Sequence, residues 1–148
     1  MSKKVAYVTG GMGGIGTSIC QRLAQDGYTV VAGCGPNSPR KDRWLAEQKA
    51  LGFDFIASEG NVSDWDSTKA AFDKVKAEVG EIDVLVNNAG ITKDGQFRRM
   101  SIDDWKAVID TNLNGAWYMM QAAARTWRDR GEAGSIVNIV ATIWRGMP

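Results

Sequence analysis

The chain has 148 residues, of which 44% are hydrophobic and 24% are charged, and its net charge is +1. This length predicts one domain, and the composition is typical of an ordinary soluble protein. A net charge so close to zero argues against a general attraction to nucleic acid or to an anionic membrane. No apolar run approaches the length of a membrane span, and residues 1–4 lead into a strand rather than into the apolar core of a signal peptide.

Histidine is absent from the sequence. Its absence excludes His-based catalytic triads and most zinc sites, so we expect no metal site. The two cysteines, Cys20 and Cys34, lie in a predicted helix and near the end of a predicted strand. Both fit reduced core residues, and we therefore expect a cytoplasmic protein.

The first predicted elements are a strand and a helix joined by a glycine-rich turn. Residues 4–9 are β-branched and aromatic enough for a buried strand. After the turn, Ile15, Ile19 and Leu23 recur four residues apart, which predicts a helix with one apolar face. This helix runs to about Asp26, and Gly27 is placed to end it.

The turn carries five glycines within seven residues. Gly11, Gly13 and Gly16 match the GxGxxG pattern between a strand and a helix, which favours dinucleotide binding. Glycines at this junction let a pyrophosphate approach the free N–H groups of the helix N-terminus. A turn that serves packing alone does not explain so many glycines. The predicted cofactor-binding residues of this turn are Gly10, Gly11, Met12, Gly13, Gly14, Ile15 and Gly16.

The rest of the chain alternates between strands and helices. Such alternation predicts a parallel sheet with right-handed crossovers and helices on both faces. We expect a single α/β domain over residues 1–148, a Rossmann-type doubly wound sheet of about five strands in the order 3-2-1-4-5. Further strands are predicted at 28–34, 53–58, 82–86 and 135–140, and a helix is predicted at 40–51. A second helix is predicted from a capping box of Ser63 and Asp66 to Gly80, and a third from Ser101 with Asp104 to about Arg128.

The loop after the second strand indicates which dinucleotide is bound. An acidic residue near the end of this strand bonds the ribose 2′-OH in NAD-binding folds of this kind. Residues 32–41 contain no carboxylate, and the first one is Asp42. A solvated basic helix start is the alternative, but basic side chains oppose the helix dipole there. We therefore predict a pocket for the 2′-phosphate of NADP(H) at Asn37, Ser38 and Arg40, and we include Gly35 among the cofactor-binding residues.

Three motifs in this order resemble the short-chain dehydrogenase/reductase family. They are Thr9-Gly10-x-x-x-Gly14-x-Gly16, Asn87-Asn88-Ala89-Gly90 after the fourth strand, and Asn112-Leu113-Asn114-Gly115 in the long helix. Up to about residue 113 the chain closely resembles acetoacetyl-coenzyme A reductases of polyhydroxyalkanoate synthesis. From Gly115 onward it is more similar to another branch of the family, close to enoyl-coenzyme A reductase relatives.

This resemblance implies an NADPH-dependent oxidoreductase that acts on CH–OH groups and reduces 3-oxoacyl (acetoacetyl) coenzyme A thioesters. It implies that Asn88, Ala89 and Gly90 pass under the cofactor and that Asn61 and Val62 flank the adenine. Asn112 matches the asparagine that holds a proton-relay water. A kink residue that bonds its own helix backbone is the alternative for Asn112, and both roles are compatible.

The resemblance also locates what the sequence lacks. The position of the family's catalytic serine is taken by Ala141, and Thr142 follows it. None of the three tyrosines is followed four residues later by lysine, so the family's Tyr-x-x-x-Lys pair is expected beyond Pro148, together with two further strands. We therefore expect an incomplete NADP(H)-binding domain without catalytic activity. The alternative is a catalytically empty nucleotide-binding half-domain: a fragment, a chimera or an engineered chain.

Two further expectations concern partners. Asp94, Arg98 and Arg99 lie near the substrate entrance in the family, where positive charge suits a coenzyme A thioester. A solvated loop is the interpretation that we favour for them, and the substrate entrance is the alternative. An unpaired outer edge of the strand at 135–140 is expected to favour dimers or larger assemblies, through the region of Trp117 and Trp127.

Overall fold

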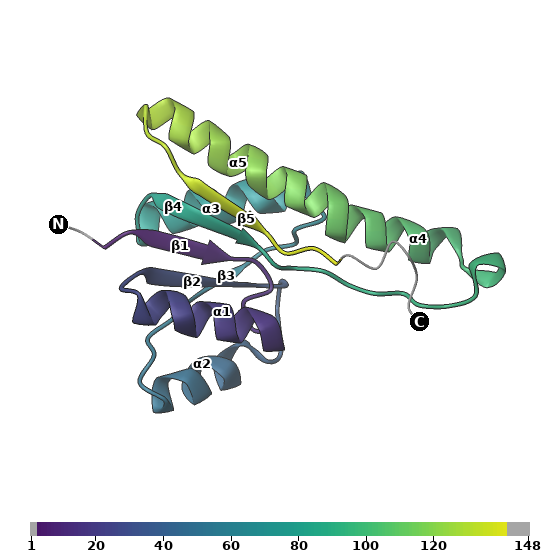
Figure 1. Ribbon diagram of the computed structural model, residues 1–148, viewed down its shortest axis with the longest axis horizontal. Helices are drawn as coiled ribbons and strands as arrows, with labels where there is room; N and C mark the ends of the chain where they lie inside the picture. The colour runs from purple at the N-terminus through teal and green to yellow at the C-terminus, as the bar shows by residue number, and fades with distance from the viewer. Residues whose placement is uncertain (1–2, 142–148) are drawn as a thin grey trace.

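The computed structural model describes residues 3–141 and consists of one sheet with helices on both faces (Figure 1). The elements before the fourth strand are β1 (Val5–Val8), α1 (Gly14–Gln25), β2 (Thr29–Cys34), α2 (Lys41–Ala50), β3 (Ile56–Glu59) and α3 (Trp65–Glu78). The remaining elements are β4 (Ile82–Asn87), the 3₁₀ turn η1 (Phe97–Arg99), α4 (Ile102–Val108), the π-helical segment η2 (Ile109–Asn114), α5 (Gly115–Arg130) and β5 (Ser135–Asn138).

The five strands are all parallel and lie in the order β3-β2-β1-β4-β5, which confirms the predicted fold. β1 is central and pairs with β2 on one side and with β4 on the other. Strands β2 and β3 are added on one side of β1, whereas β4 and β5 are added on the other side. The loops that follow β1 and β4 therefore diverge and leave a crevice at the carboxyl ends of these two strands.

Two apolar cores hold the layers together, one on each face of the sheet. On one face α1 and α2 cover Val8, Val30 and Ala32, and Cys20 and Trp44 fill the space between. On the other face α3 and α5 cover the sheet, and the buried residues there include Val5, Tyr7, Val31, Phe72, Leu85 and Met119. Each fully buried aliphatic side chain stabilises the fold by about 1.5–3 kcal/mol, so both helical layers are firmly attached.

Two of the predicted element starts differ from the structure for a reason that its contacts show. β3 begins at Ile56 and not at residue 53, because Phe53 stacks on Phe55 and Phe55 stacks on Trp44 of α2 instead of extending the strand. The N-cap of α3 is Asp64, whose carboxylate accepts a hydrogen bond from the Ser67 amide at 2.7 Å. Aspartate is one of the strongest N-cap residues, so the helix begins one residue later than the Ser63 capping box predicts.

The long helix begins as predicted but is not regular. The Ser101 hydroxyl accepts a hydrogen bond from the Asp104 amide at 3.0 Å and caps α4. The helix then widens into η2 before it continues as α5, which ends at Gly131 in a left-handed conformation. In the described range 3–141 no helix is long and apolar enough to span a bilayer.

Trp127 near the end of α5 is buried, with 8% of its surface exposed. Its indole N–H donates a hydrogen bond of 2.7 Å to the carbonyl oxygen of Ile82 in β4. The predicted association through Trp127 is therefore wrong, because this side chain attaches α5 to the sheet. Trp117 is 55% exposed and stays available.

Candidate functional site

Three glycines of the turn after β1 are required by close packing. Gly10 has a φ of +59°, and a Cβ atom there would lie 3.0 Å from the Ala89 Cα. A Cβ at Gly11 would lie 2.9 Å from the Ala32 Cα, and one at Gly16 would collide with the Gly10 carbonyl oxygen. These glycines let the loops after β1 and β4 and the first turn of α1 approach one another.

Gly13 and Gly14 are less crowded. A Cβ at Gly13 would lie 3.5 Å from the Gly10 carbonyl oxygen, which is an ordinary contact. A Cβ at Gly14 would meet no atom within 4 Å. Gly13 is the N-cap of α1, and no side chain caps the free N–H groups of the first turn. A helix N-terminus of this kind attracts an anion. The cavity in front of it measures about 460 Å³ and is lined by Gly10, Gly13, Gly14, Ile15, Gly16, Asn88, Ala89 and Gly90.

Thr9 and Asn88 fix the two sides of this cavity to each other. The Thr9 side chain is buried, and its hydroxyl oxygen accepts hydrogen bonds from the Asn88 amide at 3.0 Å and the Ala89 amide at 2.9 Å. The Asn88 side-chain amide donates in return to the carbonyl oxygens of Thr9 at 3.2 Å and Gly10 at 3.1 Å. The loops after β1 and β4 therefore form one rigid unit.

A second cavity of about 270 Å³ opens beside the first, at the ends of β2 and β3. Its lining includes Gly35, Asn61 and Val62 together with Ala89 and Gly90. The Asn61 side chain is held locally, because its Oδ1 accepts hydrogen bonds from the Ser63 amide at 3.1 Å and the Ser63 hydroxyl at 2.7 Å. This cavity brings together residues that the sequence assigns to the adenine side of a dinucleotide.

Tyr7 and Cys34 also line this second cavity. The Tyr7 hydroxyl donates a hydrogen bond to Ser58 Oγ at 2.9 Å, and burial raises the pKa of Tyr7 to about 12. Burial and the nearby Glu59 carboxylate raise the pKa of Cys34. Both groups therefore stay protonated and neutral at neutral pH, and they present an uncharged wall.

The loop between β2 and α2 leads to two basic side chains, Arg40 and Lys41, which are not among the residues that line this cavity. Asn37 has a φ of +53°, which turns the chain toward α2. Arg40 is the N-cap of α2, and its guanidinium donates a hydrogen bond of 3.3 Å to the Met12 carbonyl oxygen in the glycine-rich turn. Lys41 forms a salt bridge of 3.3 Å with Glu59 at the end of β3. Ser38 lies within this loop, and its carbonyl oxygen accepts from the Lys41 amide at 3.2 Å.

Asn112 lies at a third cavity of about 260 Å³, which is lined in part by Asn87, Asn138 and Val140. The Asn112 side chain forms hydrogen bonds with the Ile91 backbone in the loop after β4 and not with its own helix backbone. The alternative prediction, that Asn112 bonds its own helix backbone, is therefore wrong. A helical irregularity is nevertheless present, because Asn112 lies in the π-helical segment η2. Ala141 directly follows the Val140 wall of this cavity and is exposed.

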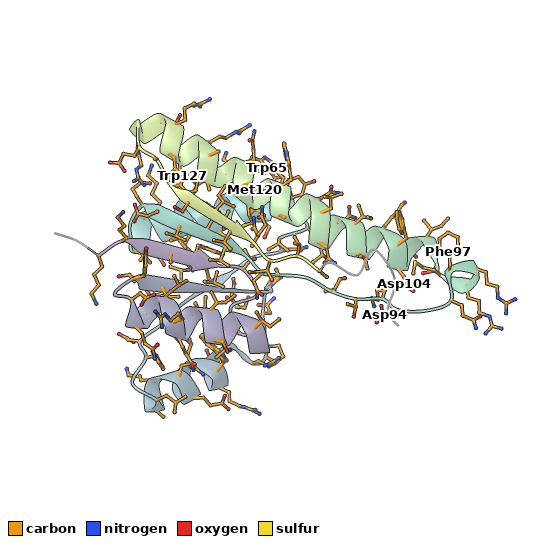
Figure 2. All side chains as sticks on the ribbon, in the orientation of Figure 1. Trp65, Asp94, Phe97, Asp104, Met120 and Trp127 are labelled. Atoms are coloured by element: carbon orange, nitrogen blue, oxygen red, sulfur yellow. The ribbon has the colours of Figure 1, made fainter. Side chains whose placement is uncertain are left out.

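Asp94, Arg98 and Arg99 lie apart from these three cavities. The segment after β4 extends away from the sheet, and Figure 2 shows Asp94 and Phe97 at the opposite end of the molecule from Trp127. Arg98 and Arg99 belong to the exposed 3₁₀ turn η1. None of the three is among the residues that line the cavities at the sheet edge.

Sequence reasoning missed the roles of Thr9 and Lys41. The position of Thr9 at the end of a buried strand is a signal for the first, since a buried hydroxyl there must find backbone partners. The ion pair of Lys41 has no local signal, because Glu59 is distant in sequence. Within the part of the chain described, no three metal-ligating side chains are grouped to hold a metal ion.

Comparison with known proteins identifies this arrangement. The model of the family described as short chain dehydrogenase matches residues 4–144. The chain belongs to the short-chain dehydrogenase family. Acetoacetyl-CoA reductase of Cupriavidus necator is 68% identical over 139 residues, which are 94% of this chain and 56% of that protein. Nodulation protein G of Azospirillum brasilense is 50% identical over 139 residues, with the same two shares.

Solved structures agree with this family. The crystal structure of a gluconate 5-dehydrogenase from Burkholderia cenocepacia in complex with NADP and tartrate superposes with a TM-score of 0.83 at 33% identity, and the match covers 95% of this chain and 55% of that one. The present chain therefore spans about half the length of the relatives that it matches.

Proposed function

We propose that this short-chain dehydrogenase chain binds NADP(H) and is the nucleotide-binding part of a reductase of 3-oxoacyl coenzyme A thioesters. The observation that carries the proposal is the open space at Gly14, the first residue of α1, whose N-terminus no side chain caps. The Arg40 guanidinium is hydrogen-bonded to the turn before this helix. A Cβ at Gly14 would fill the space that a pyrophosphate needs. The similarity to an acetoacetyl-CoA reductase and to a dehydrogenase crystallised with NADP supports the assignment.

The proposed contacts follow the three cavities. The amides at the start of α1, from Gly13 to Gly16, would hold the pyrophosphate. Gly35, Asn61 and Val62 would flank the adenosine, and the remaining residues from Gly10 to Ile15 would shape the turn. Asn37, Ser38 and Arg40 would bind the 2′-phosphate, where a charge-assisted hydrogen bond is short and strong. Asn88, Ala89 and Gly90 would support the nicotinamide end.

The chemistry needs a proton donor as well as a cofactor. When bound, NADPH supplies a hydride to the carbonyl carbon of the substrate. The residues described here bind and orient, and Asn112 lies at the cavity where the reacting end is expected. Ala141 carries no hydroxyl to stabilise the developing oxyanion, and none of the tyrosines is followed four residues later by lysine. Catalysis therefore needs groups that these 148 residues do not supply.

The second candidate function is a nucleotide-binding half-domain without catalysis. The alanine at position 141 favours it, because the resemblance places the family's serine there. Turnover of acetoacetyl-coenzyme A by a fusion to the C-terminal remainder of the Cupriavidus necator relative separates the two functions. Part of a reductase should gain NADPH oxidation in that fusion, whereas a half-domain without catalysis should still bind NADPH and not oxidise it. On the resemblance alone we place the reductase in the cytoplasm and in the supply of polyhydroxyalkanoate precursors. The resemblance also assigns Asp94 and Arg99 to the substrate entrance, whereas in the structure neither lines the three cavities at the sheet edge.

Titration of the chain with NADPH and NADH tests the proposed cofactor. NADPH is expected to bind more tightly, and Arg40→Ala is expected to weaken NADPH alone by about 1.5–3 kcal/mol, or roughly 10- to 150-fold. Arg43→Ala is the matched control, because Arg43 lies on the same helix and pairs with Glu47 at 2.8 Å. Equal affinities for both nucleotides in the unmodified chain would refute the assignment.

A further inference from the structure

Helices α1 and α2 are joined by two side-chain hydrogen bonds, spaced four residues apart on each helix. The Trp44 indole N–H donates to the Thr17 hydroxyl at 2.9 Å, and the Gln21 side-chain amide donates to Gln48 Oε1 at 2.8 Å. Because four residues are close to one helical turn, the two bonds form successive bridges along the same interface. The two bridges differ in the further contacts that their side chains make.

The bridge at Thr17 continues into the glycine-rich turn. The Thr17 hydroxyl donates a hydrogen bond of 2.6 Å to the Gly13 carbonyl oxygen, which also accepts from the Thr17 amide at 2.8 Å. Gly13 is the N-cap of α1, so this hydroxyl connects α2 to the residue that opens the anion-binding turn. The bridge at Gln21 lies one turn further along α1 and has no such connection to the turn.

Trp44 is fixed at the other end of the bridge. Only 5% of its surface is exposed, and its ring stacks on Phe55 with centroids 5.3 Å apart. Its backbone amide donates to the Arg40 carbonyl oxygen at 2.9 Å, so Arg40 lies one helical turn before it. The Arg40 guanidinium donates to the Met12 carbonyl oxygen at 3.3 Å. The contacts therefore form a closed ring from Met12 through Arg40, Trp44 and Thr17 to Gly13.

We propose that Thr17 and Trp44 are positioning residues that set the preference for NADP(H) over NAD(H), by holding the start of α2 at a fixed distance from the glycine-rich turn. The proposal rests on the proposed function. NADP(H) carries a pyrophosphate and a 2′-phosphate at a separation set by the adenosine. Charge-assisted hydrogen bonds need donor–acceptor distances of about 2.7–2.9 Å, so the two subsites must keep this separation. NAD(H) has no 2′-phosphate, so its binding depends less on the separation between the two subsites.

Thr17→Val tests the proposal, because valine keeps the shape of the side chain and removes the hydroxyl. The variant is expected to weaken NADPH binding roughly 2- to 10-fold, the effect of one lost hydrogen bond, and to weaken NADH binding less, so that the affinity ratio falls. Thr17→Ser restores the hydroxyl and is expected to restore the ratio. Trp44→Phe keeps the stacking on Phe55, loses the N–H and is expected to act like Thr17→Val.

Gln21→Leu is the matched control, because it removes the other bridge between the same helices. It is expected to lower the melting temperature without changing the NADPH/NADH ratio. A ratio that falls as much in Gln21→Leu as in Thr17→Val would overturn the proposal in favour of general helix packing. Equal weakening of both nucleotides by Thr17→Val would overturn it too. If Thr17→Val does not fold, Trp44→Phe decides.

Failure of this inference is distinguishable from failure of the proposed function. If the unmodified chain prefers NADPH and Arg40→Ala removes the preference while Thr17→Val and Trp44→Phe keep it, only the positioning role is wrong. If the unmodified chain does not distinguish NADPH from NADH, the proposed cofactor site and the positioning role are both wrong.

Discussion

The Asn112 side chain and the Ile91 backbone are joined by two hydrogen bonds. Asn112 Oδ1 accepts from the Ile91 amide at 2.8 Å, and Asn112 Nδ2 donates to the Ile91 carbonyl oxygen at 2.9 Å. The pair connects the π-helical segment η2 to the segment that follows β4. It therefore continues the chain of contacts that Thr9 and Asn88 begin, from the glycine-rich turn across the sheet edge to the long helix.

Asn112→Ala is expected to loosen this segment. Both hydrogen bonds are lost, and since each neutral bond contributes about 0.5–1.5 kcal/mol, the free energy of unfolding should fall by about 1–3 kcal/mol. Asn112→Asp keeps the acceptor, so its free energy of unfolding should lie between those of the unmodified chain and Asn112→Ala. Urea unfolding measures the loss, and hydrogen exchange of the Ile91 amide should quicken. Asn114→Ala, which removes a bond to Asp110 within η2, is the control, and an equally fast Ile91 amide there would argue against the specific role.

Gly14 and Gly16 are expected to respond differently to alanine. A Cβ at Gly14 meets no atom, and alanine has the higher helix propensity, so Gly14→Ala should keep or slightly raise the melting temperature while it weakens NADPH binding. A Cβ at Gly16 collides with the Gly10 carbonyl oxygen, so Gly16→Ala should destabilise the fold by several kcal/mol. Thermal melts with and without NADPH measure both effects. Unchanged NADPH affinity in Gly14→Ala would contradict the proposal that the pyrophosphate binds at this position.

Local patterns were sufficient to predict the fold. The apolar strand at β1, the glycine-rich turn and the amphipathic spacing of α1 agree with one another, and the alternation of elements fixes a parallel sheet. The Ser101 cap was predictable because its partner is three residues away. Boundaries failed where two local signals competed, as at Ser63 and Asp64, or where a distant contact intervened, as in the stacking of Phe55 on Trp44.

The candidate site was predictable as a set of motifs but not as a set of contacts. Sequence order places Gly13, Asn61 and Asn88 at strand ends, which is enough to bring them to one edge of the sheet. It does not reveal that Trp127 points into the core or that the Asn112 side chain bonds Ile91, because helical spacing alone does not say which face a long helix buries at each turn. The link from Trp44 on α2 through Thr17 on α1 to Gly13 joins two helices and has no signature in the sequence.

Self-association is expected through the edge of β5. In the part of the chain that the structure describes, β5 pairs with β4 only, and Ile136, Val137 and Ile139 are 38–48% exposed. An apolar edge strand invites pairing with a second chain. Sedimentation at micromolar concentration should therefore show dimers or larger species, and Val137→Lys should shift them toward monomer. Leu51→Lys is the control, since Leu51 is exposed at the end of α2. A monodisperse monomer of the unmodified chain would contradict the expectation.

The 148-residue chain is expected to show no measurable reduction of acetoacetyl-coenzyme A. Loss of a positioned acid costs about 10²–10⁴ in rate, and loss of an oxyanion donor costs about a further 10²–10³. Fusion to the C-terminal remainder of the Cupriavidus necator relative should restore some activity, and Ala141→Ser in that fusion should restore more, whereas Ala141→Ser alone should restore none. NADPH consumption measured at 340 nm gives the order.

Activity that rises from the chain to the fusion, and again in the fusion with Ala141→Ser, would indicate that the chain lacks a proton donor and an oxyanion donor rather than a folded site. If the unmodified chain oxidises NADPH with substrate at ordinary enzyme rates, a different acid must act. Tyr118 and Lys93 are then the side chains to replace. Tyr118 lies on α5 with its ring 6.0 Å from that of Trp65, and the Lys93 ammonium lies 3.9 Å from an Asp104 carboxylate oxygen. Neither lines the three cavities at the sheet edge. Activity through Lys93 would therefore also require the segment after β4 to move toward the cavity at Asn112, and activity through Tyr118 would require α5 to change its position.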